Sequence, residues 1–184
     1  PTLKLRAGLR YTDDEKDFVA DRIQAPPFSP TFIGQISTST DDSHVTWDIS
    51  ALWSANEDVN FYARVANGFR APSIQGRLLF GDTISTAESE TVLSHELGVK
   101  ADFWDNRARL NFNLFHYSVY NQQLTAVGGA ANFNQLINAK KTVGKGFEFD
   151  FDAYLTDQLL VTFGASLNDT EIQDPNLSTQ PCGG

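Results

Sequence analysis

The chain contains the stretch Phe147-Glu148-Phe149-Asp150-Phe151-Asp152-Ala153, in which apolar and acidic side chains alternate without a break. Successive side chains of a β-strand point to opposite faces of its sheet, so this stretch predicts a strand with one apolar and one acidic face. The same period of two recurs along the rest of the chain in six other runs. They are residues 2–11, 44–54, 59–69, 95–103, 108–114 and 159–168. No Asp, Glu, Lys or Arg falls on the apolar face of any run.

The lengths and connections of the runs separate two classes of sheet. A soluble β-sandwich also has strands with one apolar and one polar face. The runs here are about ten residues long, which suits tilted strands that cross a bilayer better than the usual strand of about five or six residues. Short connections at 55–58, 104–106 and 155–157 alternate with long ones at 12–43, 70–91 and 121–140. All the short connections therefore lie at one end of the sheet, as the periplasmic turns of an outer-membrane barrel do.

Aromatic residues flank the short connections and support the membrane interpretation. These residues are Trp53, Phe61, Phe103, Trp104 and Tyr154. Amphipathic rings prefer the membrane–water interface, so a girdle is expected at this level. The predicted fold class is all-β, an antiparallel up-and-down transmembrane β-barrel segment with about seven long strands, short periplasmic turns and long external loops. A soluble β-sandwich adhesin is the alternative.

The composition sets limits on function. The 184 residues include 23 acidic and 14 basic ones, for a net charge of −9, and 41% of them are hydrophobic. An acidic chain is poorly suited to bind the phosphates of nucleic acid, and the apolar content argues against disorder. No apolar run approaches the roughly 18 residues of a transmembrane helix. Bacterial single-chain barrels use an even number of strands, so seven strands indicate a piece of a longer barrel.

Four segments carry a family resemblance. They are Asn60-Phe61-Tyr62-Ala63-Arg64-Val65-Ala66-Asn67-Gly68-Phe69-Arg70-Ala71-Pro72-Ser73, Glu96-Leu97-Gly98-Val99-Lys100, Leu114-Phe115-His116-Tyr117-Ser118-Val119-Tyr120-Asn121, and Asn138-Ala139 followed by Gly144-Lys145-Gly146-Phe147-Glu148-Phe149-Asp150. In their order and spacing they resemble the barrel portion of TonB-dependent outer-membrane receptors. The first looks like the family's strand that ends in a Gly-Phe-Arg-Ala-Pro corner. The resemblance spans nearly the whole chain.

The resemblance implies a partial β-barrel domain over residues 1–184, from which the plug domain, the TonB-engaging motif and the remaining strands are missing. It implies energised uptake of a scarce nutrient through the outer membrane of a Gram-negative bacterium, with no enzymatic activity and no cofactor. A ferric siderophore or related iron complex is the first expectation for the substrate, and haem, cobalamin and carbohydrate are alternatives. The implied partners are outer-membrane lipid, the plug and other strands of the parent chain, the TonB complex and a small-molecule ligand such as a metal chelate. A small outer-membrane barrel enzyme is the alternative function.

Two groups of residues are candidates for the functional site. The polar faces of the runs are expected to line the lumen and face the plug, and their candidate residues are Tyr62, Arg64, Glu96, Lys100, Arg109, Glu148, Asp150 and Asp152. The three cations among them are expected to pair with the acids Glu148, Asp150 and Asp152 across strands or to contact the plug. The external segment supplies the candidates for ligand binding, which are Arg70, Gln75 and Arg77. Glycines on the polar face are expected either to leave room for the plug or to ease bending of the sheet, and they are Gly68, Gly98, Gly144 and Gly146.

No sequence pattern indicates catalysis or a metal site. The three histidines are scattered, and the acidic segments 13–15 and 41–42 lack the ligand pattern of a calcium loop. The acids of the 147–153 run lie about 7 Å apart along one strand, whereas a glycosidase needs two carboxylates that converge at a cleft. Cys182 is the single cysteine, so it is expected to pair outside this sequence or to have no role.

Overall fold

The computed structural model describes residues 1–23, 33–77, 84–129 and 133–181, and Cys182 lies outside them. The strands are β1 (Thr2–Arg22), β2 (Gly34–Ser54), β3 (Val59–Arg70), β4 (Ser73–Gln75), β5 (Ser85–Ala87), β6 (Glu90–Phe103), β7 (Ala108–Gly128), β8 (Phe133–Thr156) and β9 (Leu159–Ile172). The described part of the chain contains no helix, and hence none long and apolar enough to cross a membrane.

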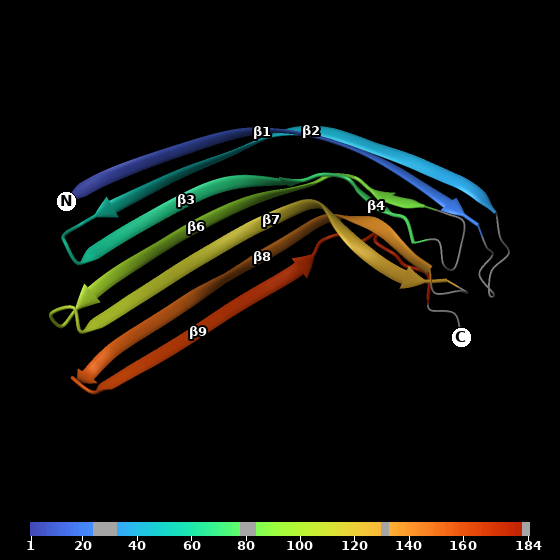
Figure 1. Cartoon of the computed structure of the whole chain (residues 1–184). Helices are drawn as coiled ribbons and strands as arrows, with labels where there is room; N and C mark the ends of the chain where they lie inside the picture. The colour runs from blue at the N-terminus through green and yellow to red at the C-terminus, as the bar shows by residue number, and fades with distance from the viewer. Residues whose placement is uncertain (24–32, 78–83, 130–132, 182–184) are drawn as a thin grey trace.

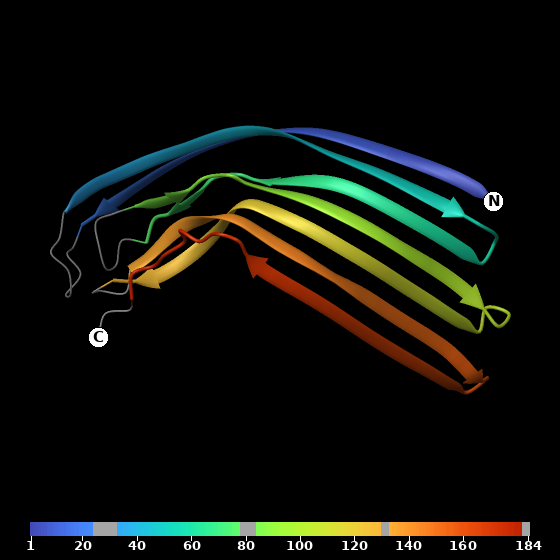
Figure 2. The ribbon, with the colours of Figure 1, turned by 180° about the vertical axis from the view of Figure 1, so that it is seen from behind.

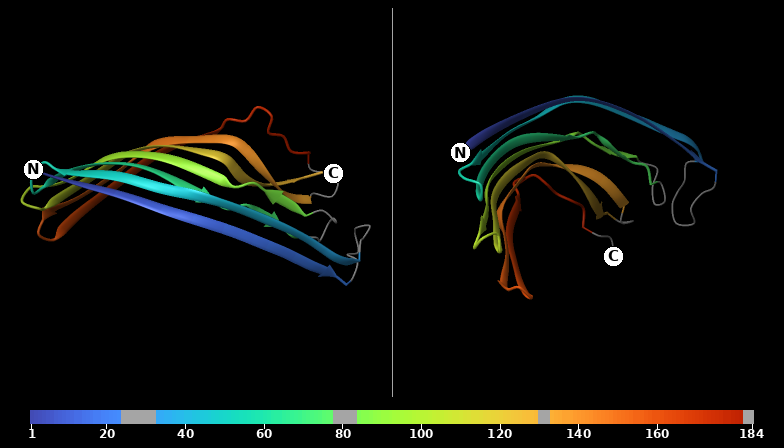
Figure 3. Two further views of the ribbon diagram at one scale, coloured as in Figure 1. Left: turned by 90° about the horizontal axis from the view of Figure 1, so that it is seen from above. Right: turned by 60° about the vertical axis from the view of Figure 1, so that its left-hand side comes forward.

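Seven long strands form one antiparallel sheet in the order β1-β2-β3-β6-β7-β8-β9. Each pairs with its neighbours along the chain, apart from the short β4–β5 hairpin that is inserted between β3 and β6 (Figure 1). The sheet is a single curved layer in every view (Figures 2 and 3). The predicted all-β, antiparallel, up-and-down fold is confirmed. The two packed sheets of a β-sandwich do not occur among the described residues.

The strand register places the apolar residues of all seven strands on one face. Register partners across the sheet form continuous apolar rows. One row consists of Leu5, Ala51, Ala63, Leu97, Leu114, Phe147 and Leu167. A shift of one residue in any strand would move its apolar side chains to the opposite face, so these rows confirm the face assigned to each run. We call this side of the sheet the apolar face and the other side the polar face.

The short connections are tight turns, as predicted. Asn56 Oδ1 accepts hydrogen bonds from the backbone N–H groups of Asp58 and Val59, at 2.9 and 2.7 Å, and so closes the β2–β3 turn. In the β6–β7 turn, Arg107 N donates to Trp104 O at 3.1 Å. Residues 104–106 have φ between 54° and 63° there, a left-handed conformation that closes the turn in few residues.

The aromatic residues beside the turns pair with each other. The rings of Trp53 and Phe61 stack with centroids 5.4 Å apart, and those of Phe103 and Trp104 meet edge to face at 5.3 Å. Trp53, Trp104 and Tyr154 are each about half exposed in this sheet, at 48%, 59% and 49%. Such amphipathic rings at one level of the sheet are typical of the interfacial girdle of a membrane barrel.

Two of the three long loops are largely strand, so their predicted extent is wrong. β1 continues to Arg22 and β2 begins at Gly34, with unbroken pairing down to Thr2 and Ser54. Likewise, β7 continues to Gly128 and β8 begins at Phe133. The third loop, 70–91, contains β4 and β5. For β1 and β2 the sequence pattern missed the extension because the residues that continue the apolar-face phase are mostly polar, although backbone pairing does not depend on which side chains alternate.

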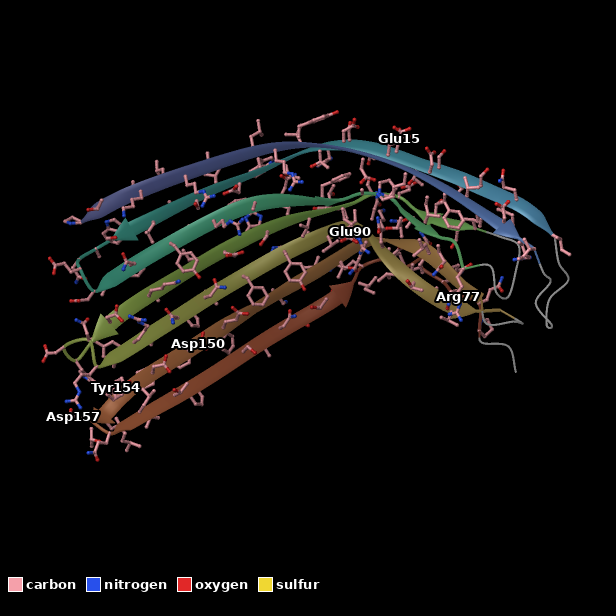
Figure 4. The ribbon with its side chains drawn as sticks, in the orientation of Figure 1. Glu15, Arg77, Glu90, Asp150, Tyr154 and Asp157 are labelled. Carbon is pink, nitrogen blue, oxygen red and sulfur yellow. The ribbon has the colours of Figure 1, made fainter. Side chains whose placement is uncertain are left out.

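The outward face of β1 and β2 changes character where the predicted runs end. Up to Tyr11 its side chains are apolar, and beyond that point they include Asp13, Glu15 and Asp17 on β1 and Asp41 on β2. Glu15 lies on the half of β1 toward the long connections (Figure 4). Charged side chains are costly in lipid, so this change marks the level at which the hairpin leaves the apolar band.

Candidate functional site

The eight predicted lumen residues all lie on the polar face of the sheet. Their positions on β3, β6, β7 and β8 have the phase opposite to that of the apolar rows, and the register places Arg64 beside Glu96 and Arg109 beside Asp152. Asp150 lies about midway along the main part of β8, far from the bend near Glu90 (Figure 4). The structure therefore brings together on one wall residues that are up to 90 positions apart in the sequence, since Tyr62 and Asp152 share it.

Two of the cations on this wall pair with acids other than those of β8, and the third lies near a tyrosine ring. Arg64 lies 3.8 Å from Glu96, and Arg109 Nε donates to Asp102 Oδ1 at 2.7 Å. Lys100 Nζ lies 5.9 Å from the centroid of the Tyr62 ring. All these cations are at least partly in solvent, where water screens their charges, so these pairs contribute little to the stability of the sheet.

The acids of β8 form no ion pair among the described residues, so the pairing expected with these cations does not occur there, and the alternative, contact with the plug, stays a prediction. The register explains why. Asn111 and Asn113 of β7 lie opposite Asp150 and Glu148 and separate them from Lys100 of β6 and Arg64 of β3. Arg109 lies between Asp102 and Asp152 in the register, and its side chain turns toward Asp102. Glu148 and Asp150 of β8 thus have no ion-pair partner among the described residues, whereas Asp152 lies opposite Arg109.

Two glycines of the polar face are covered by tyrosine rings from a neighbouring strand. A Cβ at Gly98 would lie 2.4 Å from the ring of Tyr62, and a Cβ at Gly144 would lie 2.1 Å from that of Tyr117. The space left by each missing side chain is therefore filled from within the sheet. Covering a strand glycine with a cross-strand ring is a known way to pin the register of a sheet.

The described residues between β3 and β6, 71–77 and 84–89, leave the sheet at its bend, and we call them the excursion. It contains β4, β5 and the candidate ligand residues Gln75 and Arg77, while Arg70 lies at its start. Arg77 N donates to Gln75 Oε1 at 3.0 Å, and Arg70 lies 3.9 Å from the carboxylate of Glu90. Arg77 lies toward the end of the sheet that carries the long connections (Figure 4). Residues 78–83 of the same external segment lie outside the described residues.

Sequence reasoning missed the residues that fix the excursion. Gln123 and Asn138 fall in a segment that was predicted to be a loop, yet both lie in long strands and bond to the backbone of the excursion. Their partners are 35–52 positions away in the sequence. Two isolated polar residues give no local signal of contacts at such separations.

The remaining candidates for chemistry are dispersed. No three His, Cys, Asp or Glu side chains of the described ranges are placed to hold a metal ion. The His44 ring stacks on Phe69 with centroids 5.0 Å apart, and those of His95 and His116 lie 6.2 Å apart on the apolar-face phase.

Comparison with known proteins shows which family has this architecture. The family model described as "TonB dependent receptor-like, beta-barrel" matches residues 1–181. The chain belongs to the TonB-dependent receptor family. Receptors of this family act in transport rather than as enzymes and lie in the outer membrane of Gram-negative bacteria. The resemblance deduced from the four sequence segments is thereby confirmed.

A curated relative and solved receptor structures resemble the chain over most of its length. The ferric-pyoverdine M114 receptor PbuA of Pseudomonas sp. (strain M114) is 25% identical over 147 residues, which are 79% of this chain and 17% of the relative. The ferric yersiniabactin uptake receptor FyuA of Yersinia pestis has a TM-score of 0.72 at 16% identity, over 93% of this chain and 24% of that receptor. The siderophore receptor PiuA of Acinetobacter baumannii has a TM-score of 0.64 at 20% identity, over 97% and 24%. At these identities the solved structures show the fold, and the chain spans less than a quarter of each protein's length.

Proposed function

We propose that this chain is part of the wall of an outer-membrane receptor that takes up a ferric siderophore or a related iron complex with energy from the TonB complex. The observation that carries the proposal is the unbroken apolar face across seven strands in a chain of this family. The names of the relatives add the substrate class, since PbuA is a ferric-pyoverdine receptor and FyuA a ferric yersiniabactin uptake receptor.

The rest of the parent protein is proposed to supply the remaining barrel strands and the plug domain. β1 pairs only with β2, and β9 only with β8, among the described residues. A sheet edge in lipid exposes unpaired N–H and C=O groups at a cost of several kcal/mol each, so further strands are needed to close the wall. The apolar face then contacts outer-membrane lipid, and the polar face surrounds the plug.

The division of the chain suggests how its parts act. The excursion, with Gln75 and Arg77, lies on the side of the long external connections and is proposed to contact the incoming iron complex. The polar wall of β3, β6, β7 and β8 is proposed to line the path that opens when force transmitted through TonB moves the plug. Its fixed charges keep that path hydrated, as the polar interior of membrane barrels does.

Uptake by the full-length receptor tests the proposal. Cells that lack the gene for the parent receptor are expected to take up one or more radiolabelled ferric siderophores several-fold more slowly under iron limitation, and the intact gene is expected to restore the rate. A second deletion strain without TonB is expected to lose the same uptake. Unchanged uptake of every ferric chelate, with loss of haem, cobalamin or carbohydrate uptake instead, would overturn the assignment to iron.

The unpaired acids of β8 provide a prediction about the lumen. We infer that Glu148 and Asp150 face basic groups of the plug, because no cation of the described wall satisfies them. Asp150→Arg in the full-length receptor is expected to loosen the plug and lower, several-fold, the inhibitory concentration of a large antibiotic that the outer membrane normally excludes. Asp17→Arg, on the outward face of β1 beyond the apolar band, is the matched control and is expected to change nothing. Equal sensitivity of both variants at normal receptor abundance would contradict the inference.

A further inference from the structure

One buried glutamine on β7 ties together the two ends of the excursion. The side chain of Gln123, which is 8% exposed, donates from Nε2 to the carbonyl oxygens of Ala71 at 2.8 Å and Glu88 at 2.9 Å. Its Oε1 accepts from Ser73 Oγ at 2.6 Å. Both amide protons and the amide oxygen are thus used. Ala71 and Ser73 lie where the chain leaves β3, and Glu88 lies where it returns to β6, so a single side chain closes the excursion at its base.

The backbone of the same residue adds a fourth contact. Gln123 N donates to Glu90 Oε2 at 2.7 Å, and the Glu90 carboxylate also lies 3.9 Å from Arg70. Figure 4 shows Glu90 at the bend of the sheet, where the excursion begins and ends. A hydrogen bond to a carboxylate is stronger than one between neutral groups. The bond between Gln123 and Glu90 therefore also holds the start of β6, where the chain returns to the sheet, against β7.

A second amide fixes the returning leg of the excursion to β8. Asn138 Oδ1 accepts from Glu88 N at 2.8 Å, and its Nδ2 donates to Glu88 O at 3.0 Å and to Asn121 O at 2.7 Å. Leu136 N donates to Ser85 Oγ at 2.9 Å. β5 packs on β8 along this line. The excursion is therefore fastened to two long strands rather than only to the strands that it connects.

These contacts fix where Gln75 and Arg77 project. Both residues belong to the segment that Gln123 closes, and Arg77 is only four positions after Ser73 in the sequence. A closed base restricts the positions open to a loop, because loop freedom depends on the distance between its fixed ends. A ligand that contacts a restricted loop loses less free energy in ordering it.

We propose that Gln123 is a positioning residue whose three side-chain hydrogen bonds hold the excursion, and with it Gln75 and Arg77, where they meet the ligand. This inference rests on the proposed function for its ligand, but its structural part does not. Gln123→Glu is the sharpest variant, because it keeps the size of the side chain and an acceptor for Ser73 and removes both donors to the carbonyl oxygens. Gln135→Glu, the same change at an exposed position of β8, is the matched control.

The experiment compares the full-length receptor and its variants in outer membranes, with two measurements. The first is the rate of trypsin cleavage after Arg77, identified by mass, without ligand. The second is uptake of a radiolabelled ferric siderophore that the parent receptor transports, as a function of concentration. Gln123→Glu is expected to speed cleavage and to raise the half-saturating concentration roughly tenfold, which corresponds to about 1.4 kcal/mol. The maximal uptake rate is expected to stay within about twofold, because the charged residues of β3, β6, β7 and β8 that are proposed to line the path are unchanged. Gln135→Glu is expected to match the parent in both.

Unchanged cleavage at Arg77, or an unchanged half-saturating concentration at normal abundance, would overturn the inference. If Gln123→Glu does not accumulate, Ser73→Ala decides instead, because it removes one of the three bonds and leaves Gln123 in place. Faster cleavage of Ser73→Ala would support the inference and parental cleavage would overturn it. A parent receptor that transports no ferric chelate would refute the proposed function while the cleavage comparison still decides whether Gln123 fixes the excursion.

Discussion

Phe149→Arg is expected to abolish or severely reduce assembly of the receptor in the outer membrane. Phe149 lies on the apolar face of β8, between its register partners Phe112 and Ala165, and its ring centroid is 5.9 Å from that of Phe163. A cation on the lipid side of a barrel costs about 2–4 kcal/mol near the bilayer midplane, and the aromatic contacts are lost as well. The measurement is the amount of receptor in purified outer membranes that keeps its folded, heat-modifiable mobility in gel electrophoresis.

The adjacent residue supplies the control. Asp150→Asn changes a polar side chain on the opposite face of the same strand, removes a charge that has no ion-pair partner among the described residues, and is expected to assemble like the parent. Adjacent positions on one strand differ in local backbone environment far less than in the medium they face. Equal assembly of the two variants would contradict the assignment of the faces and, with it, the membrane orientation of the whole sheet.

The period of two in the sequence predicted the sheet because lipid requires it. Within the apolar band every second side chain must be apolar, so a run such as 147–153 reports both the strand and its faces. The register followed for the same reason, since each short turn aligns two runs whose apolar residues must share a side. Outside the band this requirement ends. β1 and β2 therefore continue as a paired ribbon whose outward residues carry acids, and the sequence gives no alternation by which to find them.

Local sequence patterns could not predict the side-chain contacts that fix the candidate site. Arg64 pairs with Glu96 because the β3–β6 register sets them side by side, and that register depends on how the chain returns after the excursion. Arg109 has an acid on each side and pairs with Asp102. Gln123 reaches a carbonyl oxygen 52 residues earlier in the chain. Side-chain pairing on a sheet is decided by strand order and register together, so a sequence that correctly predicts the strands still leaves the pairs open.

Gly146→Ala is expected to destabilise the folded receptor by about 1–3 kcal/mol, as overpacking of a well-packed site does. A Cβ at Gly146 would lie 1.9 Å from the carbonyl oxygen of Leu167 and 2.7 Å from Cζ of Phe115. The Phe115 ring is the far end of a flexible side chain, but the carbonyl belongs to the backbone of β9. It moves only if the β8–β9 pairing is displaced, and that pairing continues to Thr142 and Ile172.

A glycine-to-alanine substitution on the other strand of this pair is the control for the clash with the carbonyl oxygen of Leu167. Gly164, on β9, also lies on the polar face, and a Cβ there would meet its nearest atom, Oδ1 of Asp150, at 3.5 Å, an ordinary contact. Replacing a strand glycine with alanine at a compatible site stabilises a protein by about 0.4–1 kcal/mol, because the unfolded chain loses freedom. Gly164→Ala is therefore expected to raise the denaturant midpoint for unfolding from lipid vesicles, and Gly146→Ala to lower it. Midpoints that shift in the same direction would contradict this prediction. They would mean that the β8–β9 pairing adjusts to a Cβ at Gly146, and that contact with the carbonyl oxygen of Leu167 does not require glycine at this position.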